Sequence, residues 1–439
     1  MYYRRHLEDR LTGPVSRNKV RLLFGARQTG KTWLLRRLLA GQDTRAFDLQ
    51  DTAVRRRFEA DPATFSREVR ALPRSVTSVV LDEIQKVPAL LDEIQRLYDA
   101  SPSRWQFYLT GSSARRLRSG TANLLPGRSH GYHLYPVCGW EVDRHGPAPE
   151  LPAPVEPGRR QGRPGIKRPS SEQPVGAHPD RPRDVRTPGE HRWFPPQGLT
   201  RVLQVGSLPG VRGESIPTAQ ATLASYVDHY LEEEIRREAL VKDVGPFATF
   251  LRLAASESGR QVNVARLSQE SGVSASTLKN YYQVLVDTFV GYWMTAYAGR
   301  TRKRLLTAPR FYVFDLGVRQ AAAETPLHPR LPDELGATLL EQWVALELIA
   351  RAGYAGRPHR VSFWRTAYGV EVDFIWEAPR EDIPIEVKWT ARPRPADARH
   401  LETFLDEFPG RARRGLLVCR CAHPQQLTDR VRALPWHAL

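Results

Sequence analysis

The sequence predicts an α/β protein of several domains, and three observations support this fold class. The chain has 439 residues, enough for roughly two to four domains that each bury a core. Over residues 1–140, short apolar runs alternate with helical patterns, as in a mostly parallel sheet with helices on both faces. After a mainly helical region at 201–305, residues 306–439 again mix strands with helices.

The elements of the first domain follow from the spacing of its apolar residues. Short apolar runs that end at glycine or acidic residues predict strands, and leucines at helical spacing predict helices. The expected strands are Val20–Phe24, Ala46–Leu49, Val76–Leu81 and Gln106–Leu109, and the expected helices are Thr32–Ala40 and Ala89–Asp99. Strands that are separated by helices favour parallel pairing.

The region 201–305 is predicted to be helical and to contain a helix-turn-helix. The expected helices are Ala221–Glu238, Phe247–Ala255, Val264–Glu270 and Ala275–Asp287. The last two are separated by a tight turn, and Ser274 is a suitable N-cap for the second of them. This pair of helices is compatible with a winged-helix module, which serves either nucleic-acid binding or domain packing.

The last region, 306–439, is predicted to follow the order α-β-β-β-α-β after one preceding strand. The expected strands are Phe311–Phe314, Val361–Trp364, Glu371–Trp376, Ile385–Trp389 and, as the last of the chain, Gly415–Val418, with helices at Glu334–Ala352 and Ala396–Phe408.

Residues 141–200 differ from both neighbouring regions. About 13 of these 60 residues are proline, and large apolar residues are too few to bury a core. One interpretation is a disordered linker rich in proline and arginine. The abrupt change at both edges supports a second hypothesis, that this segment is read in a shifted frame and replaces an ordered one.

Composition narrows the class of protein further. The formal charge is +17, from 65 basic and 48 acidic residues, which indicates either a polyanionic partner or a bias of composition toward arginine. Three cysteines, Cys138, Cys419 and Cys421, cannot form a disulfide framework. No apolar run approaches the ~18 residues of a membrane helix. We therefore expect a cytoplasmic protein that does not associate with membranes.

The most specific motif is a phosphate-binding loop between the first strand and the first helix. Its residues are Gly25, Ala26, Arg27, Gln28, Thr29, Gly30, Lys31 and Thr32, which fit G-x-x-x-x-G-K-[ST]. Glycines let the backbone wrap around an anion, and the helix N-terminus adds a positive dipole. Lys31 is expected on the β- and γ-phosphates and Thr32 on Mg²⁺. The sequence thus predicts binding of a nucleoside triphosphate with Mg²⁺.

Acidic and small polar residues at later strand ends complete this predicted site. Asp82 follows an apolar strand and is expected to hold Mg²⁺, and Glu83 is placed to polarise the attacking water. Ser112 follows the next strand and is either a γ-phosphate sensor or a helix cap. Arg128 is expected either as an arginine finger acting on a neighbouring subunit or as an ordinary surface residue.

A second group of charged residues lies in the C-terminal region. Glu386 and Lys388 are two apart on one predicted strand and share a face, and Asp373 lies on the strand before it. Glu341, on the preceding helix, can converge on the same place. Such carboxylates can hold Mg²⁺ while the lysine offsets charge. The alternative is an ion cluster without catalytic activity.

The motifs resemble a known family. The P-loop, Leu81–Gln85 and Leu109–Ser113 followed by Leu-Pro-Gly-Arg128 resemble the AAA-type P-loop ATPases of bacteria and archaea, in the branch with a C-terminal DUF4143 domain. Gly206–Val211 is similar to that branch's Gly-Gly-x-Pro element. The resemblance implies ATP as the nucleotide and a helical segment across 141–200, where this chain departs from the family.

The carboxylate group resembles the PD-(D/E)xK nuclease fold, whose core has the order α-β-β-β-α-β. The resemblance implies that Asp373 and Glu386 are metal ligands, that Lys388 is catalytic and that Glu341 is the helix carboxylate. Val372 stands where the motif has proline. Cleavage of nucleic acid does not follow from the fold alone.

Three functions remain open from the sequence. The first is an ATPase that hydrolyses Mg·ATP to drive a conformational switch of the helix-turn-helix and C-terminal domains. The second is a metal-dependent nuclease that is regulated by ATP and acts on DNA. The third is a nucleotide-binding interaction module with little turnover. DNA, a protein partner and a second copy of the chain are all compatible partners. The exposed polar residues expected to meet DNA are Ser276, Thr277, Lys279, Asn280, Arg300, Arg302, Lys303 and Arg304.

Overall fold

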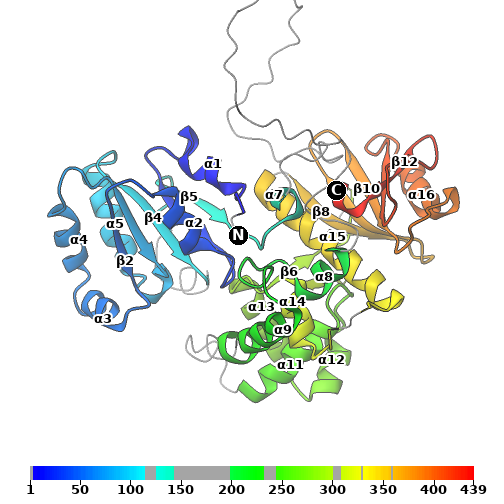
Figure 1. The fold of residues 1–439 in the computed structure, drawn as a ribbon, viewed down its shortest axis with the longest axis horizontal. Coiled ribbons are helices and arrows are strands. Elements are labelled where there is room, and N and C mark those ends of the chain that lie inside the picture. Colours follow the sequence, from blue (N-terminus) through cyan, green and yellow to red (C-terminus); the bar gives the residue numbers. More distant parts are fainter. Residues whose placement is uncertain are drawn as a thin grey trace, which may run out of the picture.

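The computed structural model describes residues 3–113, 125–142, 198–231, 244–299, 308–327, 330–356 and 359–439. Almost all of the segment predicted as a linker or as frameshifted therefore lies outside the described residues. So do Arg300, Arg302, Lys303 and Arg304. The described parts form the predicted α/β architecture, with a parallel N-terminal sheet, a helical middle and a mixed C-terminal sheet (Figure 1).

The N-terminal domain is built on a five-stranded parallel sheet with the order β2-β3-β4-β1-β5. Its strands are β1 (Val20–Phe24), β2 (Thr44–Asp48), β3 (Ser78–Asp82), β4 (Gln106–Gly111) and β5 (Ser129–His133). The first four confirm the predicted strands with shifts of one or two residues at most ends. The fifth, Ser-His-Gly-Tyr-His, has no apolar run, and its parallel pairing with β1 makes it a strand.

Helices cover both faces of this sheet. They are α1 (Leu7–Thr12), α2 (Lys31–Leu38), α3 (Thr52–Ala60), α4 (Ala63–Arg70) and α5 (Leu90–Ala100). Val79 and Leu81 point into the core with α3, α4 and α5, whereas Val80 points into the core with α1 and α2. This alternation along β3 is the reason that all three residues are apolar. The helices α2 and α5 were predicted, and α1, α3 and α4 were not.

The middle domain is mainly helical and contains the predicted helix-turn-helix. Its elements are α8 (Gly198–Val205), α9 (Ile216–Ser225), a π-helix (Tyr226–Leu231), α11 (Val244–Ser256), α12 (Val264–Ser271), α13 (Ala275–Asp287), β6 (Gly291–Met294), β7 (Arg310–Val313) and α14 (Leu316–Ala322). Ser274 caps α13 as expected, because its hydroxyl accepts a hydrogen bond from the Thr277 amide. The helix expected at Ala221–Glu238 instead changes to π geometry at Tyr226. The strands β6 and β7 pair antiparallel.

The C-terminal domain is a six-stranded mixed sheet between two helices. Its elements are α15 (Asp333–Ala355), β8 (Arg360–Arg365), β9 (Glu371–Glu377), β10 (Asp382–Val387), α16 (Arg399–Glu407), β11 (Gly415–Cys419), β12 (Gln425–Gln426) and β13 (Val431–Pro435). The strand order is β12-β13-β11-β10-β9-β8. The α-β-β-β-α-β order is confirmed. The expectation that Gly415–Val418 is the last strand is wrong, because β13 pairs parallel with β11 beyond it.

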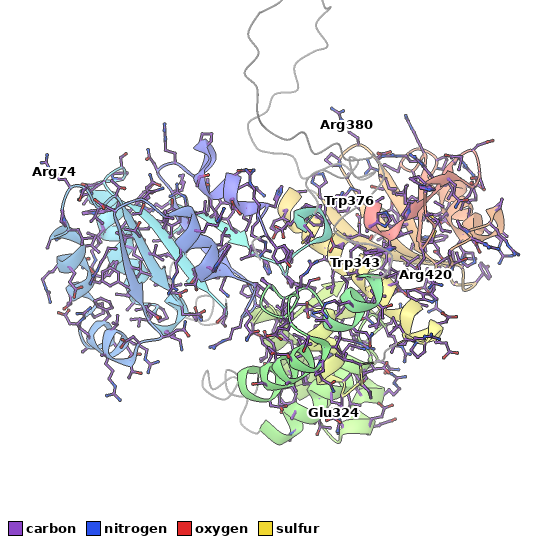
Figure 2. The ribbon with its side chains drawn as sticks, in the orientation of Figure 1. Arg74, Glu324, Trp343, Trp376, Arg380 and Arg420 are labelled. Carbon is purple, nitrogen blue, oxygen red and sulfur yellow. The ribbon has the colours of Figure 1, made fainter. Side chains whose placement is uncertain are left out.

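The long helix α15 joins the three domains. Trp343 of α15, Trp376 of β9 and Leu203 of α8 belong to one buried core. Figure 2 labels the two tryptophans. The elements β7 and α14, within the range predicted for the C-terminal domain, pack in the core of the middle domain. The segment after β5 ends in the short helix α7 (Gly139–Val142), and Gly139 contacts α15 directly. The N-terminal domain is thus held against α15 through this segment.

Candidate nucleotide site

The phosphate-binding loop lies between the end of β1 and the start of α2, as predicted. Positive φ angles occur at Gln28 (60°) and at Gly30 (94°), so the backbone curls within a few residues. Gly25 also has a positive φ (156°), and a Cβ built there lies 2.4 Å from the carbonyl oxygen of Leu134. A side chain at this position would therefore push β1 away from the segment after β5.

Lys31 and Thr32 begin α2 and face the loop and the neighbouring strand. The Lys31 Nζ donates hydrogen bonds of 2.9 Å to the carbonyl oxygens of Gly25 and Ala26. Its side chain is buried, so its charge acts in a place of reduced dielectric constant. The Thr32 hydroxyl donates to Asp82 Oδ2 at 2.8 Å. A hydroxyl and a carboxylate oxygen in contact are a donor set that suits Mg²⁺.

Asp82 and Glu83 reach the loop from β3. The Thr110 hydroxyl of β4 donates to the second carboxylate oxygen of Asp82, which orients this side chain toward Thr32. Glu83 has a φ of 60° although it is not glycine, and strained backbone of this kind is concentrated at functional sites. Ser112 donates to Glu83 Oε2 at 2.7 Å. The structure thus brings Lys31, Thr32, Asp82, Glu83 and Ser112 together.

The ionisation of Glu83 is controlled by its surroundings. Burial opposes ionisation, but the charge of Lys31 and hydrogen bonds from Ser112 and Gln85 outweigh it, and the pKa of Glu83 is lowered from its ordinary value. Glu83 is therefore an anion at neutral pH, held by donors at the edge of the loop. A carboxylate in this state can accept a proton from water.

Arg128 lies at the opposite end of β1 from the phosphate-binding loop. Its carbonyl oxygen accepts a hydrogen bond from the Val20 amide, at the amino end of β1, whereas the phosphate-binding loop follows the carboxyl end. Its guanidinium binds both carboxylate oxygens of Asp99, at 2.6 and 3.0 Å. Within one chain it therefore takes no part in the site, and only a role on a neighbouring subunit is compatible with the prediction.

The loop also contacts the middle domain, which the sequence did not indicate. Ala26 belongs to the same buried cluster as Val205 and Leu208. A Cβ built on Gly30 would lie 3.7 Å from Pro209, within the Gly206–Val211 element. The Tyr226 hydroxyl donates to the Arg27 carbonyl oxygen at 3.5 Å. The conformation of the phosphate-binding loop is therefore linked to the position of the middle domain.

The C-terminal carboxylates form a second cluster with two basic residues. Glu341 accepts a hydrogen bond of 3.1 Å from Arg310, which also pairs with Glu371. Lys388 Nζ lies 2.7 Å from Glu386 Oε1. The second oxygen of Glu386 is buried without a hydrogen-bond partner. A buried carboxylate oxygen without a donor is costly, and a bound cation would satisfy it.

Burial raises the pKa values of the carboxylates in this cluster. Burial and the charge of Asp373 raise the pKa of both Glu341 and Glu386 to about 7. Asp373 itself is oriented by the Val387 amide, which donates to it at 2.8 Å, and burial raises its pKa. Within the described ranges, however, no group of three or more His, Cys, Asp or Glu side chains has the geometry of a metal site. Arg310 pairs with Glu341, and its charge favours the ionised forms of Glu341 and Asp373.

The helix-turn-helix presents a polar surface of low charge. Ser276, Lys279 and Asn280 are exposed on α13, and Thr277 is partly covered. Nearby arginines pair with carboxylates of the same domain, as Arg266 does with Glu257. The helices α12 and α13 carry two basic and two acidic residues, Arg266, Lys279, Glu270 and Asp287, so their formal charge does not favour contact with DNA phosphates.

Comparison with known proteins assigns the three regions to families. Residues 17–142 match the AAA_14 family of AAA domains, and residues 337–439 match the domain of unknown function DUF4143. Residues 196–328 match a further domain of unknown function, DUF8612. The chain therefore contains an AAA domain and a DUF4143 domain, as the motifs predicted.

Similar proteins are known along the whole chain. The uncharacterized proteins Mb2031c of Mycobacterium bovis and Rv2008c of Mycobacterium tuberculosis are each 23% identical over 432 residues, covering 98% of this chain and 83% of theirs. The Walker-type ATPase PABY2304 of Pyrococcus abyssi aligns with a TM-score of 0.43 at 13% identity, covering 73% of this chain and 96% of that one. Among the described residues, the helices are too short or too polar to cross a membrane.

Proposed function

We propose that this protein binds and hydrolyses Mg·ATP, and that hydrolysis changes how its middle and C-terminal domains are held. The observation that supports this most is the meeting of Lys31, Thr32, Asp82 and Glu83 at the carboxyl edge of one parallel sheet. This edge is where open α/β sheets bind ligands.

Each residue has a distinct part in the reaction. The loop amides and the Lys31 ammonium bind the phosphates and gather the charge that develops on them. Thr32 and Asp82 would hold Mg²⁺, Asp82 through water. Held by these residues, Mg²⁺ would supply Lewis-acid stabilisation of the charge on the transferred phosphoryl group. Glu83 accepts a proton from the attacking water, while Ser112 keeps its carboxylate in place.

Contact between the loop and the middle domain supports the conformational part of the proposal. Phosphates that bind at the loop displace the Lys31 ammonium from the carbonyl oxygens of Gly25 and Ala26. Ala26 packs in the core of the middle domain. A change in the loop on binding or hydrolysis therefore alters the packing of that domain.

Two substitutions test the catalytic proposal. Lys31→Ala should abolish retention of labelled ATP, whereas Glu83→Gln should retain ATP with Mg²⁺ and release phosphate at least about a hundredfold more slowly. Lys279→Ala, which removes an exposed lysine from α13, is the matched control and should behave as wild type. Failure of well-folded wild-type protein to retain ATP in the presence of Mg²⁺ would overturn the proposal. Retention without phosphate release would instead support the interaction module with little turnover.

A second candidate is a metal-dependent nuclease in the DUF4143 domain, with a PD-(D/E)xK-like core. The unpartnered oxygen of Glu386 and the raised pKa values of Glu341 and Glu386 favour it, since a divalent cation would relieve both. Mg²⁺- or Mn²⁺-dependent cutting of labelled DNA should be lost in Asp373→Ala and Lys388→Ala. Cutting that persists in both variants would exclude this site as its source.

A further inference from the structure

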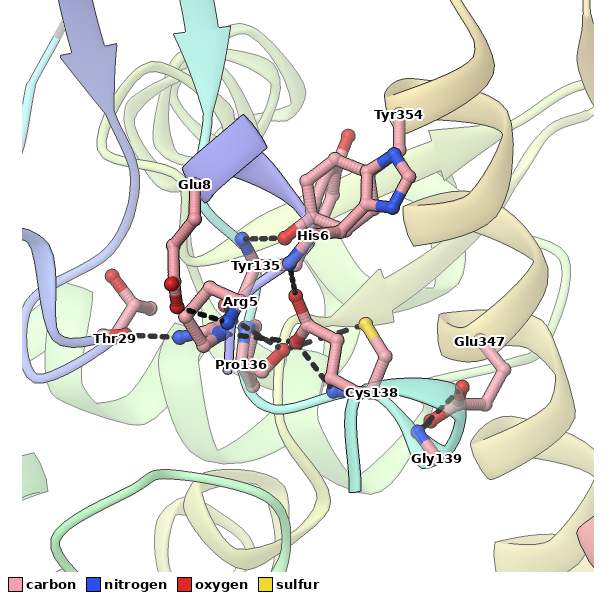
Figure 3. Close-up of polar contacts among 11 residues, drawn as sticks. Arg5, His6, Glu8, Thr29, Tyr135, Pro136, Cys138, Gly139, Glu347 and Tyr354 are labelled. Carbon is pink, nitrogen blue, oxygen red and sulfur yellow. Dashed lines mark hydrogen bonds and ion pairs between the residues drawn. The ribbon is translucent and has the colours of Figure 1, made fainter. Parts of the chain in front are cut away.

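Arg5 is a buried arginine beside the phosphate-binding loop and outside its motifs. It precedes α1 and is 3% exposed. Its guanidinium donates to Glu141 Oε2 (2.9 Å) and to the carbonyl oxygens of Thr29 (2.9 Å), Tyr135 (2.5 Å) and Pro136 (3.3 Å). These contacts come from the phosphate-binding loop and from the segment after β5, and Figure 3 shows Thr29, Tyr135 and Pro136 around the guanidinium. Such an arrangement fixes each segment relative to the others.

The contact with Thr29 acts on the amide of the next residue. A trans peptide group is planar, and its carbonyl and N–H point in opposite directions. Because Arg5 holds the Thr29 carbonyl oxygen, the Gly30 N–H is directed away from Arg5. Gly30 has a φ of 94°, and a Cβ built on it would lie 3.9 Å from a guanidinium nitrogen of Arg5. Arg5 therefore lies directly beside the peptide whose direction it sets. The Gly30 amide is one of the amides that the loop offers to a phosphate.

Arg5 also binds Glu141, which lies in α7 near the end of the AAA domain. Glu141 Oε2 also accepts from the Cys138 amide at 3.1 Å, and Oε1 accepts from the His6 amide at 2.7 Å. Burial alone would lower the pKa of Arg5, but the charge of Glu141 outweighs it and the pKa is raised. Arg5 therefore keeps its charge, and each of its three guanidinium nitrogens donates a hydrogen bond. Additional hydrogen bonds of this kind are what a stable buried ion pair requires.

The segment that contains Cys138 and Glu141 also contacts the C-terminal domain. The Gly139 amide donates to both carboxylate oxygens of Glu347 on α15, each at 3.0 Å. Hydrogen bonds thus link Thr29 to Arg5, Arg5 to Glu141, and Glu141 to the Cys138 amide, which is next to Gly139. Figure 3 shows the contacts of Arg5 with Thr29 and of Gly139 with Glu347. The series runs through the side chains of Arg5, Glu141 and Glu347 and the amides between them, so it is a physical connection between the loop and α15.

We propose that Arg5 is a positioning residue of the nucleotide site: it sets the Thr29–Gly30 peptide for phosphate binding and, through Glu141, links that setting to the contact between the AAA domain and α15. This inference rests on the proposed nucleotide binding. Because linkage is reciprocal, nucleotide and the α15 contact stabilise each other by the same factor.

The test compares Arg5→Gln with Arg4→Gln. Arg4 is the adjacent residue, and its exposed side chain pairs with Asp9 at the surface. With a fluorescent ATP analogue and steady-state hydrolysis, Arg5→Gln should raise Kd and KM about tenfold or more, as expected for losing a charge-assisted hydrogen bond, and change kcat much less. Arg4→Gln should match wild type, and Arg5→Lys should recover part of the affinity.

A double variant separates positioning from folding. Arg5→Gln leaves the Glu141 side chain buried without its cationic partner, and this can unfold the domain. Arg5→Gln with Glu141→Gln removes both charges, so it should melt at a higher temperature than Arg5→Gln alone and still bind nucleotide about tenfold more weakly than wild type. If the folded double variant binds as tightly as Arg4→Gln, Arg5 has a structural role only and the inference is wrong. If wild type does not bind, the proposed function itself fails.

Discussion

Glu347→Gln is expected to stabilise the protein at neutral pH and to remove part of its pH dependence. Glu347 is buried on α15, and burial raises its pKa from 4.5 to about 8. The surrounding charges act in both directions, because Glu141 raises this pKa whereas the Gly139 amide, Arg351 and Arg212 lower it. The folded protein therefore holds a proton on Glu347 at pH 7, and the unfolded chain does not.

The magnitude follows from proton linkage. Between pH 4.5 and 8 the folded state binds one more proton at this site, so the free energy of unfolding falls by about 1.4 kcal/mol per pH unit as pH rises. At pH 7 the free energy of unfolding of the wild type is therefore lower by about 3 kcal/mol than at low pH. The Glu347→Gln variant does not lose this stability, because glutamine does not ionise. Gln has one acceptor oxygen where Glu347 uses two, at a cost of about 1 kcal/mol. The net gain at pH 7 is about 2 kcal/mol, and it vanishes near pH 5.

Urea unfolding between pH 5 and 9 measures this effect. The difference in unfolding free energy between Glu347→Gln and wild type should grow from pH 5 to 8 and then stay level. Glu334→Gln is the control, because it removes an exposed carboxylate from the same helix. A difference that does not change with pH would show that Glu347 is ionised in the folded protein, and the reasoning from burial would be refuted.

Two further substitutions test the geometry of the nucleotide site. Gly25→Ala should abolish ATP binding, because its Cβ would lie 2.4 Å from the Leu134 carbonyl oxygen; Gly131→Ala, where a Cβ meets nothing within 4 Å, should bind ATP normally in the same equilibrium assay. Thr110→Val removes the hydroxyl that donates to Asp82 and should raise the Mg²⁺ concentration for half-maximal hydrolysis about tenfold. An unchanged Mg²⁺ requirement would mean that Thr110 does not orient Asp82.

Most strands could be predicted from the sequence because their buried residues form short, continuous apolar runs. The strand β3 has three apolar residues facing two cores, and α13 has both its cap and its apolar spacing in local sequence. In contrast, β5 has one buried residue in five, and it exists as a strand because β1 offers it a partner. The local sequence pattern does not show that a segment will pair with a distant strand.

The sequence by itself determined the chemistry of the nucleotide site, since a phosphate-binding loop takes its anion with contiguous backbone amides and one lysine. Only the tertiary structure decided what surrounds that loop. Arg5 bonds residues 24 and 136 positions away, and Glu347 bonds a residue 208 positions away. Contacts between residues so far apart arise from packing of whole domains, and no periodicity or motif in the chain encodes them.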